Sequence, residues 1–537
     1  MRSREYDWAT IHPRKQIMRA FWIQPLLALT LVIPTGIFAA ETPQPTATTM
    51  QGKVAGTWVK SNTQKAFLGI PYATPPVGDL RWKAPQPPSA WKGVRDATKY
   101  GNRCEQWHIW EDYIFQDAGP SEDCLFLNIY TPPTAKPGSK LPVMVWIHGG
   151  GFIAGSGDEP RYSNSALVAQ NVILVTINYR LGVMGFLASE DLAKEQGGHA
   201  GNYGLMDQVA ALRWVKANIS AFGGNPSNVT IFGESAGSFA VSALSVAPSA
   251  QGLFQKMIGE SGGFFGNARS ASTADERGKR DQEWVDSLGV KNLAELRALP
   301  IDKILDAAKK RRGGGFSPLI DGRFLLEPVA ETYAAGKQAH VPSLIGWNRD
   351  ERAGTLSKDM TVEKWKAYAT EHYGAKADEF LAAFPGADQK QVTQSANDLT
   401  TAQFIGLGTW RWVEAQAKTG RAPVYRYRFD RPAPIERLHP YGYAFHSSEL
   451  EFVFGTLDVR HGATWQPEDR KLSNEVVHYW TNFARSGNPN GPGLPVWPRY
   501  DTTKELIHLD SKITTSPDTA RVKYEFVNEN EARPSRP

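Results

Sequence analysis

The stretch VTIFGESAGSFA, residues 229–240, constrains the fold of this chain more than any other. An apolar run rich in β-branched residues ends at Gly233, and a run of small helix-forming residues begins directly after Ser235. A strand that passes straight into a helix must turn sharply, which strains the backbone of the central residue. The glycines on both sides, Gly233 and Gly237, remove the β-carbons that would clash in such a turn. The pattern therefore predicts a serine held clear of a sheet, at the N-terminus of a helix.

A serine in this place is typical of a nucleophile elbow, because the helix amides and dipole favour negative charge that develops beside the hydroxyl. The pattern is short, so a plain strand-to-helix turn is the alternative. Acyl transfer also needs preformed hydrogen-bond donors for an oxyanion. The run His148-Gly149-Gly150-Gly151 follows the apolar stretch VMVWI, and backbone without side chains can point N–H groups at a ligand. Taken alone, this run also fits a glycine-rich β-turn.

The rest of the chain alternates short β-rich runs with helix-like runs. Strands are expected at 141–151, 171–180, 228–233 and 254–262, and helices at 204–222 and 235–246. Near-continuous apolar strands separated by helices predict an α/β fold with a mostly parallel central sheet and helices on both faces. No flexible linker or shift in composition divides residues 50–537, so a single large domain is expected.

Residues 1–40 have the pattern of a secretory signal peptide. Basic residues extend to Arg19, and the apolar core 21–32 is followed by a polar stretch rich in Pro and Thr. The core is too short for a membrane span of about 20 residues. We expect cleavage near residues 39–40, which leaves residues 41–537 as the catalytic domain, secreted or periplasmic. The basic stretch before Met18 is unusually long, so Met18 is an alternative start; an uncleaved N-terminal anchor is the alternative interpretation.

Composition limits the partners. The formal net charge is +5, of which residues 1–40 contribute +3, so the remainder has no basic surplus suited to nucleic acid. The sequence has no CxxC pair and no HExxH, and we expect no metal and no cofactor. The only two cysteines, Cys104 and Cys124, could form a disulfide in an oxidising compartment or remain two buried thiols.

Several long segments resemble the type B carboxylesterases, an α/β-hydrolase family that includes bacterial para-nitrobenzyl esterases and, more distantly, the cholinesterases. The resemblance extends over nearly all of residues 50–500, and its main segments are AFLGIPYATPPVGDLRWKAPQPP (66–88), SEDCLFLNIYTP (121–132), NISAFGGNPSNVTIFGESAGS (218–238) and YWTNFARSGNPNGPGLPVWP (479–498). It implies an α/β-hydrolase fold, hydrolysis of a small-molecule carboxylic ester to acid and alcohol, and a bacterial origin.

The resemblance also implies a catalytic triad. Ser235 matches the nucleophile, Glu351 in LIGWNRDERAGT matches the acid of a KDEG-like segment, and His446 in AFHSSELEFVFG matches the histidine. Asp350 is the rival acid, and composition does not separate it from Glu351. In this fold the triad follows the chain order serine, acid, histidine. With the acid at Glu351, spacing alone leaves six histidines: His372, His439, His446, His461, His478 and His508.

In the same way, Gly150, Gly151 and Ala236 match the three donors of the oxyanion hole, and the two cysteines match the first disulfide of the family. The mechanism implied is an acyl-enzyme on Ser235, with His446 as general base and acid and Glu351 orienting the imidazole. An amidase or a thioesterase with the same triad is the alternative, and a non-catalytic binding protein of this fold is a further one. The oligomeric state is not predicted.

Departures from the family restrict the substrate. Ile114 stands where cholinesterases have their choline-binding tryptophan, so acetylcholine is not expected, and Trp107 or Trp110 could line the site instead. The basic run from Lys309 to Arg312 fits either binding of anionic esters or a solvated helix end. Glu234, next to the serine, fits either stabilisation of a cationic intermediate or a buried hydrogen-bonded support.

Overall fold

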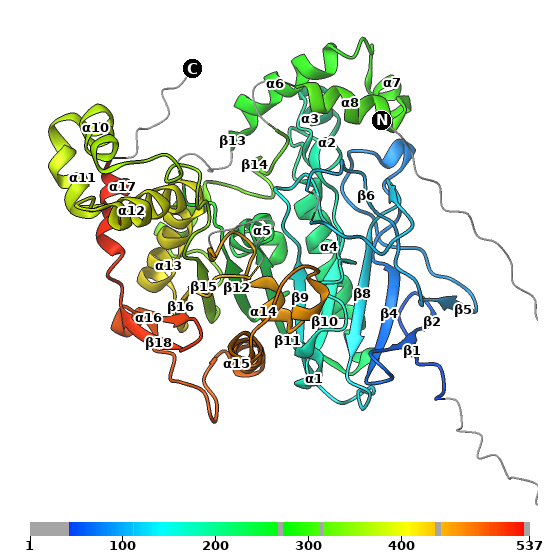
Figure 1. Cartoon of the computed structure of the whole chain (residues 1–537). Coiled ribbons are helices and arrows are strands. Elements are labelled where there is room, and N and C mark those ends of the chain that lie inside the picture. Colours follow the sequence, from blue (N-terminus) through cyan, green and yellow to red (C-terminus); the bar gives the residue numbers. More distant parts are fainter. Residues whose placement is uncertain (1–41, 111, 267–271, 312–314, 435–441, 531–537) are drawn as a thin grey trace, which may run out of the picture. The chain divides into compact units, whose positions relative to one another are not determined.

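An eleven-stranded sheet forms the centre of the structure (Figure 1). Its strands, in spatial order, are β18 (Thr514–Pro517), β17 (Glu505–Leu509), β16 (Val424–Phe429), β15 (Ser343–Asn348), β12 (Lys256–Glu260), β11 (Gly224–Glu234), β9 (Leu141–Ile147), β10 (Ile173–Ile177), β8 (Phe126–Thr131), β4 (Gln64–Pro71) and β3 (Thr57–Val59). Neighbouring strands from β17 to β10 are parallel, and the pairs outside them are antiparallel. The predicted α/β fold with a mostly parallel sheet is confirmed.

This computed structural model describes residues 42–110, 112–266, 272–311, 315–434 and 442–530. The described residues from Gln44 onward belong to one compact unit. The expected signal peptide at 1–40, with the alternative start at Met18, lies outside the described residues. Within the ranges given, no helix has both the length and the apolar character that a bilayer span requires.

Helices cover both faces of the sheet, and β9 shows why. Successive side chains of a strand point to opposite faces. Val143, Val145 and Ile147 are buried in one apolar core with α4 (Tyr203–Asn218) and α5 (Ala236–Leu244). Met144 and Trp146 are buried in another, with α1 (Ala166–Ala169), α14 (Leu450–Phe454) and α15 (Pro467–Ser486). The strand is apolar throughout because both of its faces are covered.

The helix expected at 204–222 is shorter than predicted. The α-helix α4 ends at Asn218 and a 3-10 turn continues over Ile219–Phe222. Gly223 then adopts φ 92°, a left-handed conformation that commonly follows the end of a helix. The chain thereby turns back into β11.

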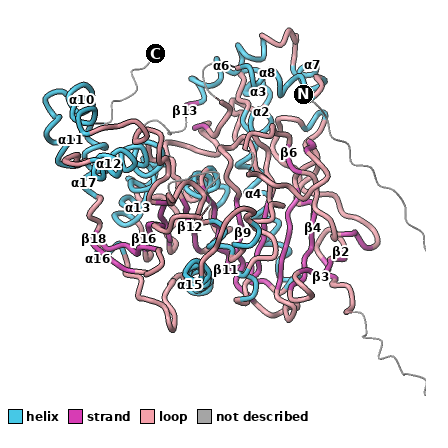
Figure 2. The backbone as a smooth tube through the Cα atoms, viewed as in Figure 1, coloured by secondary structure: helices cyan, strands magenta, loops and turns pink. Residues whose placement is uncertain are grey.

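A third apolar core lies among helices beyond β15. It contains Trp347, Trp365, Phe380 and Phe526. Figure 2 shows its helices gathered together: α10 (Val362–Tyr373), α11 (Ala377–Ala383), α12 (Gln389–Thr401), α13 (Leu407–Thr419) and α17 (Arg521–Asn530). The segment between β15 and β16 therefore folds as a helical group, and its first residues form part of the site described below.

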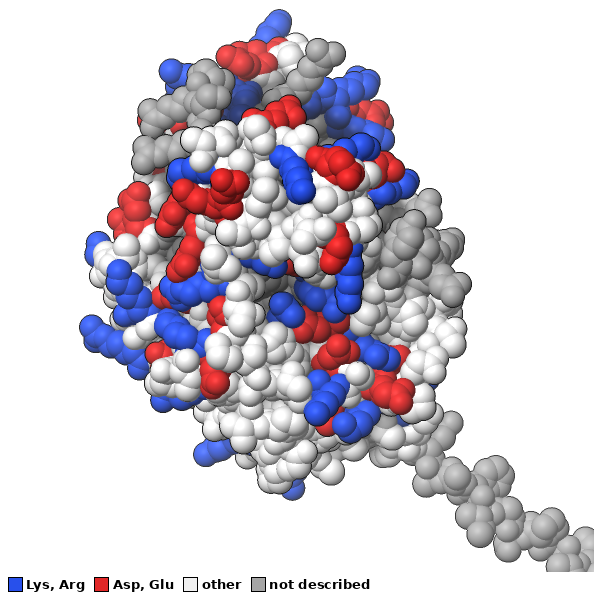
Figure 3. Space-filling view, turned by 60° about the vertical axis from the view of Figure 1, so that its left-hand side comes forward, with Lys and Arg blue, Asp and Glu red and all other residues white. Residues whose placement is uncertain are grey.

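The remaining strands and α-helices lie outside the main sheet. They are β1 (Thr46–Thr48), β2 (Lys53–Ala55), β5 (Val94–Asp96), β6 (Arg103–Cys104), β7 (Pro120–Ser121), β13 (Ser272–Thr273), β14 (Leu319–Ile320), α2 (Gly182–Phe186), α3 (Glu190–Glu195), α6 (Ala274–Asp286), α7 (Leu293–Ala298), α8 (Ile301–Lys310), α9 (Val329–Ala334) and α16 (Tyr500–Thr503). Basic and acidic side chains are interspersed over the face shown in Figure 3.

Candidate active site

Four loops meet at the carboxyl edge of the parallel strands. The glycine run follows β9, Ser235 follows β11, Glu351 lies three residues after β15, and His446 lies between β16 and α14. Parallel strands present their carboxyl ends at one edge of a sheet, which is where open α/β sheets form ligand sites. The topology therefore brings together residues that are up to 300 positions apart in the chain.

Ser235 occupies the strained turn that the sequence predicted. Its backbone has φ 53° and ψ −121°, and its amide donates to the Glu260 carbonyl oxygen at 2.8 Å. A β-carbon at Gly237 would lie 1.9 Å from the Ile147 carbonyl oxygen, and one at Gly233 would lie 2.6 Å from the Gly237 carbonyl carbon. Both glycines are thus required by close packing of the backbone, and the serine is fixed at the first turn of α5.

His446 connects Ser235 to Glu351. Its Nε2 atom lies 2.9 Å from Ser235 Oγ, and its Nδ1 atom lies 2.5 Å from Glu351 Oε2. The Glu351 side chain is fully buried, whereas the imidazole is 25% exposed. The hydroxyl, the imidazole and the carboxylate therefore form one continuous hydrogen-bonded line that opens to solvent beside the serine.

Two further donors hold Glu351, and sequence reasoning missed both. The Ser261 hydroxyl donates to Glu351 Oε1 at 2.5 Å, and the Asn348 amide donates to the same oxygen at 2.8 Å. Ser261 follows β12, which pairs with β15. The sequence signal that could have located it is its position one residue after a parallel strand, like Ser235 after β11.

The rival acid Asp350 faces elsewhere. Its carboxylate accepts a hydrogen bond from Arg349 Nε at 2.8 Å and another from the Ala444 amide at 3.2 Å. Asp350 is buried, and burial raises the pKa of its carboxyl group. It joins the Glu351 loop to the chain just before His446 and makes no hydrogen bond to the imidazole.

The other histidines left open by spacing have different surroundings. His372 and His478 each contact a carbonyl oxygen one helical turn earlier, and His508 lies 2.8 Å from Asp430 Oδ2. His461 is exposed. His439 lies outside the described residues. Among the described candidates, His446 alone is brought to Ser235.

Glu234 approaches His446 from the side of the serine. Its Oε1 atom lies 3.3 Å from His446 Nε2 and accepts a hydrogen bond from Ser447 Oγ at 2.6 Å. Burial raises the pKa of this carboxyl group. The geometry is compatible with both roles considered for Glu234, since it is hydrogen-bonded as a support and also close enough to stabilise an imidazolium.

The glycine run lies against the serine. Gly150 and Gly151 have φ 96° and 63°, and a β-carbon at Gly150 would lie 2.1 Å from the Ala154 carbonyl oxygen. Both residues line the same cavity as Ser235. Within the described part of the chain, no hydrogen bond engages the amides of Gly150, Gly151 and Ala236. These three N–H groups are therefore available to a ligand.

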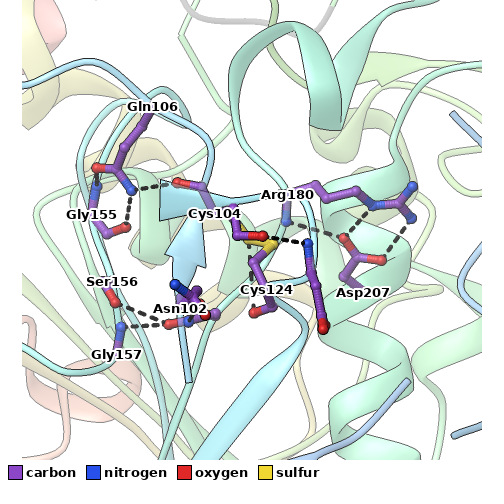
Figure 4. Close-up of a disulfide and its surroundings, with 12 residues drawn as sticks. Asn102, Cys104, Gln106, Cys124, Gly155, Ser156, Gly157, Arg180 and Asp207 are labelled. Carbon is purple, nitrogen blue, oxygen red and sulfur yellow. Dashed lines mark hydrogen bonds and ion pairs between the residues drawn. A yellow bond between two sulfur atoms is a disulfide. The ribbon is translucent and has the colours of Figure 1, made fainter. Parts of the chain in front are cut away.

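A disulfide closes a neighbouring loop that is hydrogen-bonded to the end of the glycine turn (Figure 4). Cys104 and Cys124 are bonded. Between them, Gln106 Nε2 donates to the Gly155 carbonyl oxygen and Gln106 Oε1 accepts from the Gly155 amide, both at 2.8 Å. Gly155 lies four residues after Gly151, so the loop that the disulfide closes holds the end of the glycine turn.

A cavity of about 530 Å³ opens beside Ser235. Apart from the residues already described, its walls include Trp110, Asp112, Tyr113, Arg161, Arg352, Phe404 and Phe445. Of the two tryptophans considered from the sequence, Trp110 lines this cavity and Trp107 does not. Ile114 is 47% exposed and does not line the cavity either. Aromatic rings thus surround the serine, with charged groups between them.

The described part of the basic run, from Lys309 to Arg311, does not line this cavity. Arg311 donates to Asp281 Oδ1 at 2.7 Å, and its guanidinium lies 4.3 Å from the centre of the Phe316 ring. Lys309 and Lys310 are exposed at the end of α8, and Arg312 lies outside the described residues. Arg311 therefore has a structural role, and Lys309 and Lys310 belong to a solvated helix end.

Two more carboxyl groups are buried behind the site. Trp480 Nε1 donates to Glu260 Oε1 at 2.8 Å, and burial together with the charge of Glu234 raises the pKa of Glu260 to about 8. Burial also raises the pKa of Glu449, whose side chain accepts from Asn348 Nδ2. Within the described ranges, no group of three or more His, Cys, Asp and Glu side chains is arranged to hold a metal ion.

Comparison with known proteins agrees with this geometry. A sequence profile described as the carboxylesterase family matches residues 43–527. The para-nitrobenzyl esterase of Bacillus subtilis (strain 168) is 39% identical over 491 residues, which cover 88% of this chain and 96% of that protein. The fumonisin B1 esterase of Sphingopyxis macrogoltabida is 36% identical, with 88% of each chain covered.

Solved structures give the same result. One PNB esterase structure superposes with a TM-score of 0.76 at 37% identity and covers 90% of this chain and 99% of that chain. The range matched by the family profile, residues 43–527, contains the sheet and all four loops of the site. The chain therefore belongs to the carboxylesterase family, with the α/β-hydrolase fold that its sequence predicted.

Proposed function

We propose that this protein is a serine carboxylesterase that hydrolyses small-molecule carboxylic esters through an acyl-enzyme on Ser235. One observation carries the proposal: His446 Nε2 lies 2.9 Å from Ser235 Oγ while Nδ1 lies 2.5 Å from Glu351 Oε2. A serine hydroxyl is a weak nucleophile, so a base must take its proton during attack. His446 is within reach of that proton, and Glu351 is placed to fix the tautomer and stabilise the imidazolium.

The oxyanion that forms on attack needs donors already in place. The amides of Gly150, Gly151 and Ala236 are assigned to it, since they lie beside Ser235 and engage no other described group. Collapse of the tetrahedral intermediate expels the alcohol, which receives its proton from His446. Water then attacks the acyl-enzyme with His446 as the base, and the acid leaves. Every step uses groups of this chain.

An amidase or a thioesterase would use the same triad, and a binding protein of this fold would need none. The hydrogen-bonded line at Ser235 favours a hydrolase over a binding protein. Among hydrolases, the matched family and its esterase relatives favour esters. Matched butyrate substrates separate these chemistries: p-nitrophenyl butyrate, p-nitrobutyranilide and S-phenyl thiobutyrate, compared by kcat/KM.

We also propose that the protein is exported. The basic and apolar pattern of residues 1–40 supports this, and so does the bonded cysteine pair, which persists in oxidising compartments. N-terminal sequencing of the mature protein from the periplasm or the medium tests the proposal. A mature chain that begins near residue 41 is expected; a cytoplasmic chain with its first forty residues intact would contradict it.

The decisive experiment is steady-state hydrolysis of p-nitrophenyl acetate, butyrate and octanoate by the parent and by Ser235→Ala. We expect kcat to fall at least about a thousandfold in the variant, the scale of losing a triad member. Ser227→Ala, an exposed serine at the start of the same strand, serves as the matched control and should retain parental activity. A folded parent without activity on any of the three esters would contradict the proposal.

A further inference from the structure

Arg352 stands out among the cavity residues. It follows Glu351 directly in the chain. Its side chain adds to the cavity wall a cation with five N–H donors in a planar fork. Arg352 is exposed at the mouth of the cavity that contains Ser235.

Aromatic contacts link Arg352 to the reacting centre. Its guanidinium carbon lies 4.0 Å from the centre of the Phe404 ring, a cation–π distance. The Phe404 ring in turn meets the His446 ring edge to face, with 5.1 Å between the ring centres. The guanidinium is therefore held over one aromatic ring that itself packs on the catalytic imidazole.

The other charged groups of this cavity are paired. Arg161 donates to Glu159 at 2.5 Å, and Asp112 Oδ2 lies 3.3 Å from Arg460 Nη1 and 3.9 Å from Arg161 Nη1. Glu234 accepts from Ser447, and Glu351 is bound by His446 and Ser261. In contrast, the Arg352 guanidinium has no carboxylate within ion-pair distance and no hydrogen bond, counted over the residues that the structure describes.

We propose that Arg352 binds a second, negatively charged group of the substrate, so that the enzyme prefers esters that also carry a carboxylate, such as hemiesters of dicarboxylic acids. This rests on the proposed esterase function and adds the class of substrate. A guanidinium binds a carboxylate through two parallel N–H···O bonds, which no neutral ester can accept with equal strength. The aromatic ring beneath Arg352 limits the side chain to few orientations, which reduces the entropy lost on binding.

A different role for Arg352 must be separated from this one. Its charge could offset the carboxylates of Glu234 and Glu351 and so act on the triad itself. In that case every ester would be affected equally, because every ester uses the triad. A role in substrate selection instead changes the ratio of kcat/KM between charged and neutral esters, and the change arises from KM.

The first experiment therefore uses matched pairs of esters. 4-Nitrophenyl hydrogen glutarate is compared with 4-nitrophenyl methyl glutarate, which places the charge on the acyl side. 4-Acetoxybenzoate is compared with its methyl ester, which places the charge on the alcohol side. The pair whose charged-to-neutral ratio of kcat/KM depends on Arg352 shows whether the carboxylate that Arg352 binds is on the acyl side or the alcohol side of the ester. Arg352→Gln is the test variant, and Arg323→Gln, an exposed arginine that lines another cavity, is the control.

For one of the two pairs, we expect Arg352→Gln to lower kcat/KM for the charged ester about fivefold through KM, and to change the neutral ester less than twofold. The preference should shrink in 1 M salt, because an exposed ion pair is screened. Equal losses on charged and neutral esters, or unchanged charged-to-neutral ratios in both pairs, would overturn the proposal. A parent that hydrolysed none of these esters would instead contradict the proposed esterase function, and the role of Arg352 would then be tested by the binding measurement below.

A binding measurement keeps the two questions apart. In Ser235→Ala, calorimetric titration with monomethyl glutarate and dimethyl glutarate measures affinity without turnover. Tighter binding of the monomethyl ester, lost in Ser235→Ala/Arg352→Gln, would support charge recognition whatever the reaction is. Equal affinity of the two compounds for Ser235→Ala would overturn recognition of an acyl-side carboxylate, and the same titration with 4-acetoxybenzoate and its methyl ester tests the other side.

Discussion

His446 Nδ1 lies 2.5 Å from Oε2 of Glu351, on the side of the imidazole that faces away from Ser235. The carboxylate therefore favours the tautomer with hydrogen on Nδ1, and Nε2 remains able to accept the serine proton. Glu234 meets the opposite nitrogen at 3.3 Å. The two carboxylates therefore meet different nitrogens of one ring, Glu351 at Nδ1 and Glu234 at Nε2.

Glu351→Gln should lower kcat about 10³- to 10⁴-fold with little change in KM. The amide keeps the size of the side chain but no longer stabilises the imidazolium or enforces the tautomer. Steady-state kinetics on p-nitrophenyl butyrate measures the effect. Circular dichroism confirms that the variant is folded.

Asp350→Asn is the matched control, one residue away. The change weakens the ion pair with Arg349 and should lower the free energy of unfolding, while kcat stays within about tenfold of the parent. A loss of kcat in Asp350→Asn as large as that in Glu351→Gln would overturn the choice of acid.

Gly150→Ala should lower kcat at least about a hundredfold, the scale of losing one oxyanion donor. Its β-carbon would meet the Ala154 carbonyl oxygen at 2.1 Å, so the turn must shift and move its amides. Gly138→Ala is the control, because Gly138 has a similar φ of 89° and nothing within 4 Å of the added carbon. It should cost about 1 kcal/mol of stability without loss of kcat. Equal activity of both variants would exclude Gly150 from the oxyanion hole.

The sequence predicted the local features of the site well. Gly233 and Gly237 mark the turn at Ser235 because both are needed for local backbone clearance, and such needs are visible in a short stretch. The apolar strands were predicted for a related reason, since burial on both faces requires apolar residues at every position. The identity of His446 came from the family resemblance, because six histidines satisfied the chain order.

Contacts between distant segments could not be predicted. Ser261 reaches Glu351 because β12 and β15 are neighbours, and strand order is not encoded in any local pattern. The pairing of Arg311 with Asp281 is of the same kind. Sequence alone is therefore compatible with a binding role for the basic run near residue 310, whereas the structure pairs Arg311 with a carboxylate. Likewise, the lack of a carboxylate partner for Arg352 among the described residues depends on how distant segments approach it, which no local pattern encodes.

Removal of the disulfide should destabilise the protein and weaken the glycine turn. Cys104→Ser/Cys124→Ser is expected to lower the free energy of unfolding by about 3 kcal/mol, from the entropy of closing a loop of this length. Urea unfolding with and without reductant measures this difference, and reductant should leave the stability of the double variant unchanged.

Gln106→Ala keeps the disulfide and removes two hydrogen bonds to Gly155. This variant should have a lower kcat, whereas its free energy of unfolding should change little. An unaffected kcat would contradict the link between this loop and the glycine turn.

Glu260 should make the stability of the protein depend on pH. Its pKa is raised to about 8, first by burial and then by Glu234, from an ordinary value of 4.5. Between these two values the folded state keeps a proton that the unfolded state releases. The free energy of unfolding therefore falls as pH rises through this range, and the loss is complete only above pH 8.

Glu260→Gln cannot ionise, and its amide oxygen can still accept from Trp480 Nε1. The variant should match the parent near pH 5 and exceed it at pH 9 by at least about 1 kcal/mol, the equivalent of one pKa unit. Urea unfolding at pH 5, 7 and 9 measures the difference. Glu379→Gln, an exposed glutamate on α11, should follow the parent throughout. A constant difference between Glu260→Gln and the parent across this range would show that Glu260 already ionises normally in the folded protein.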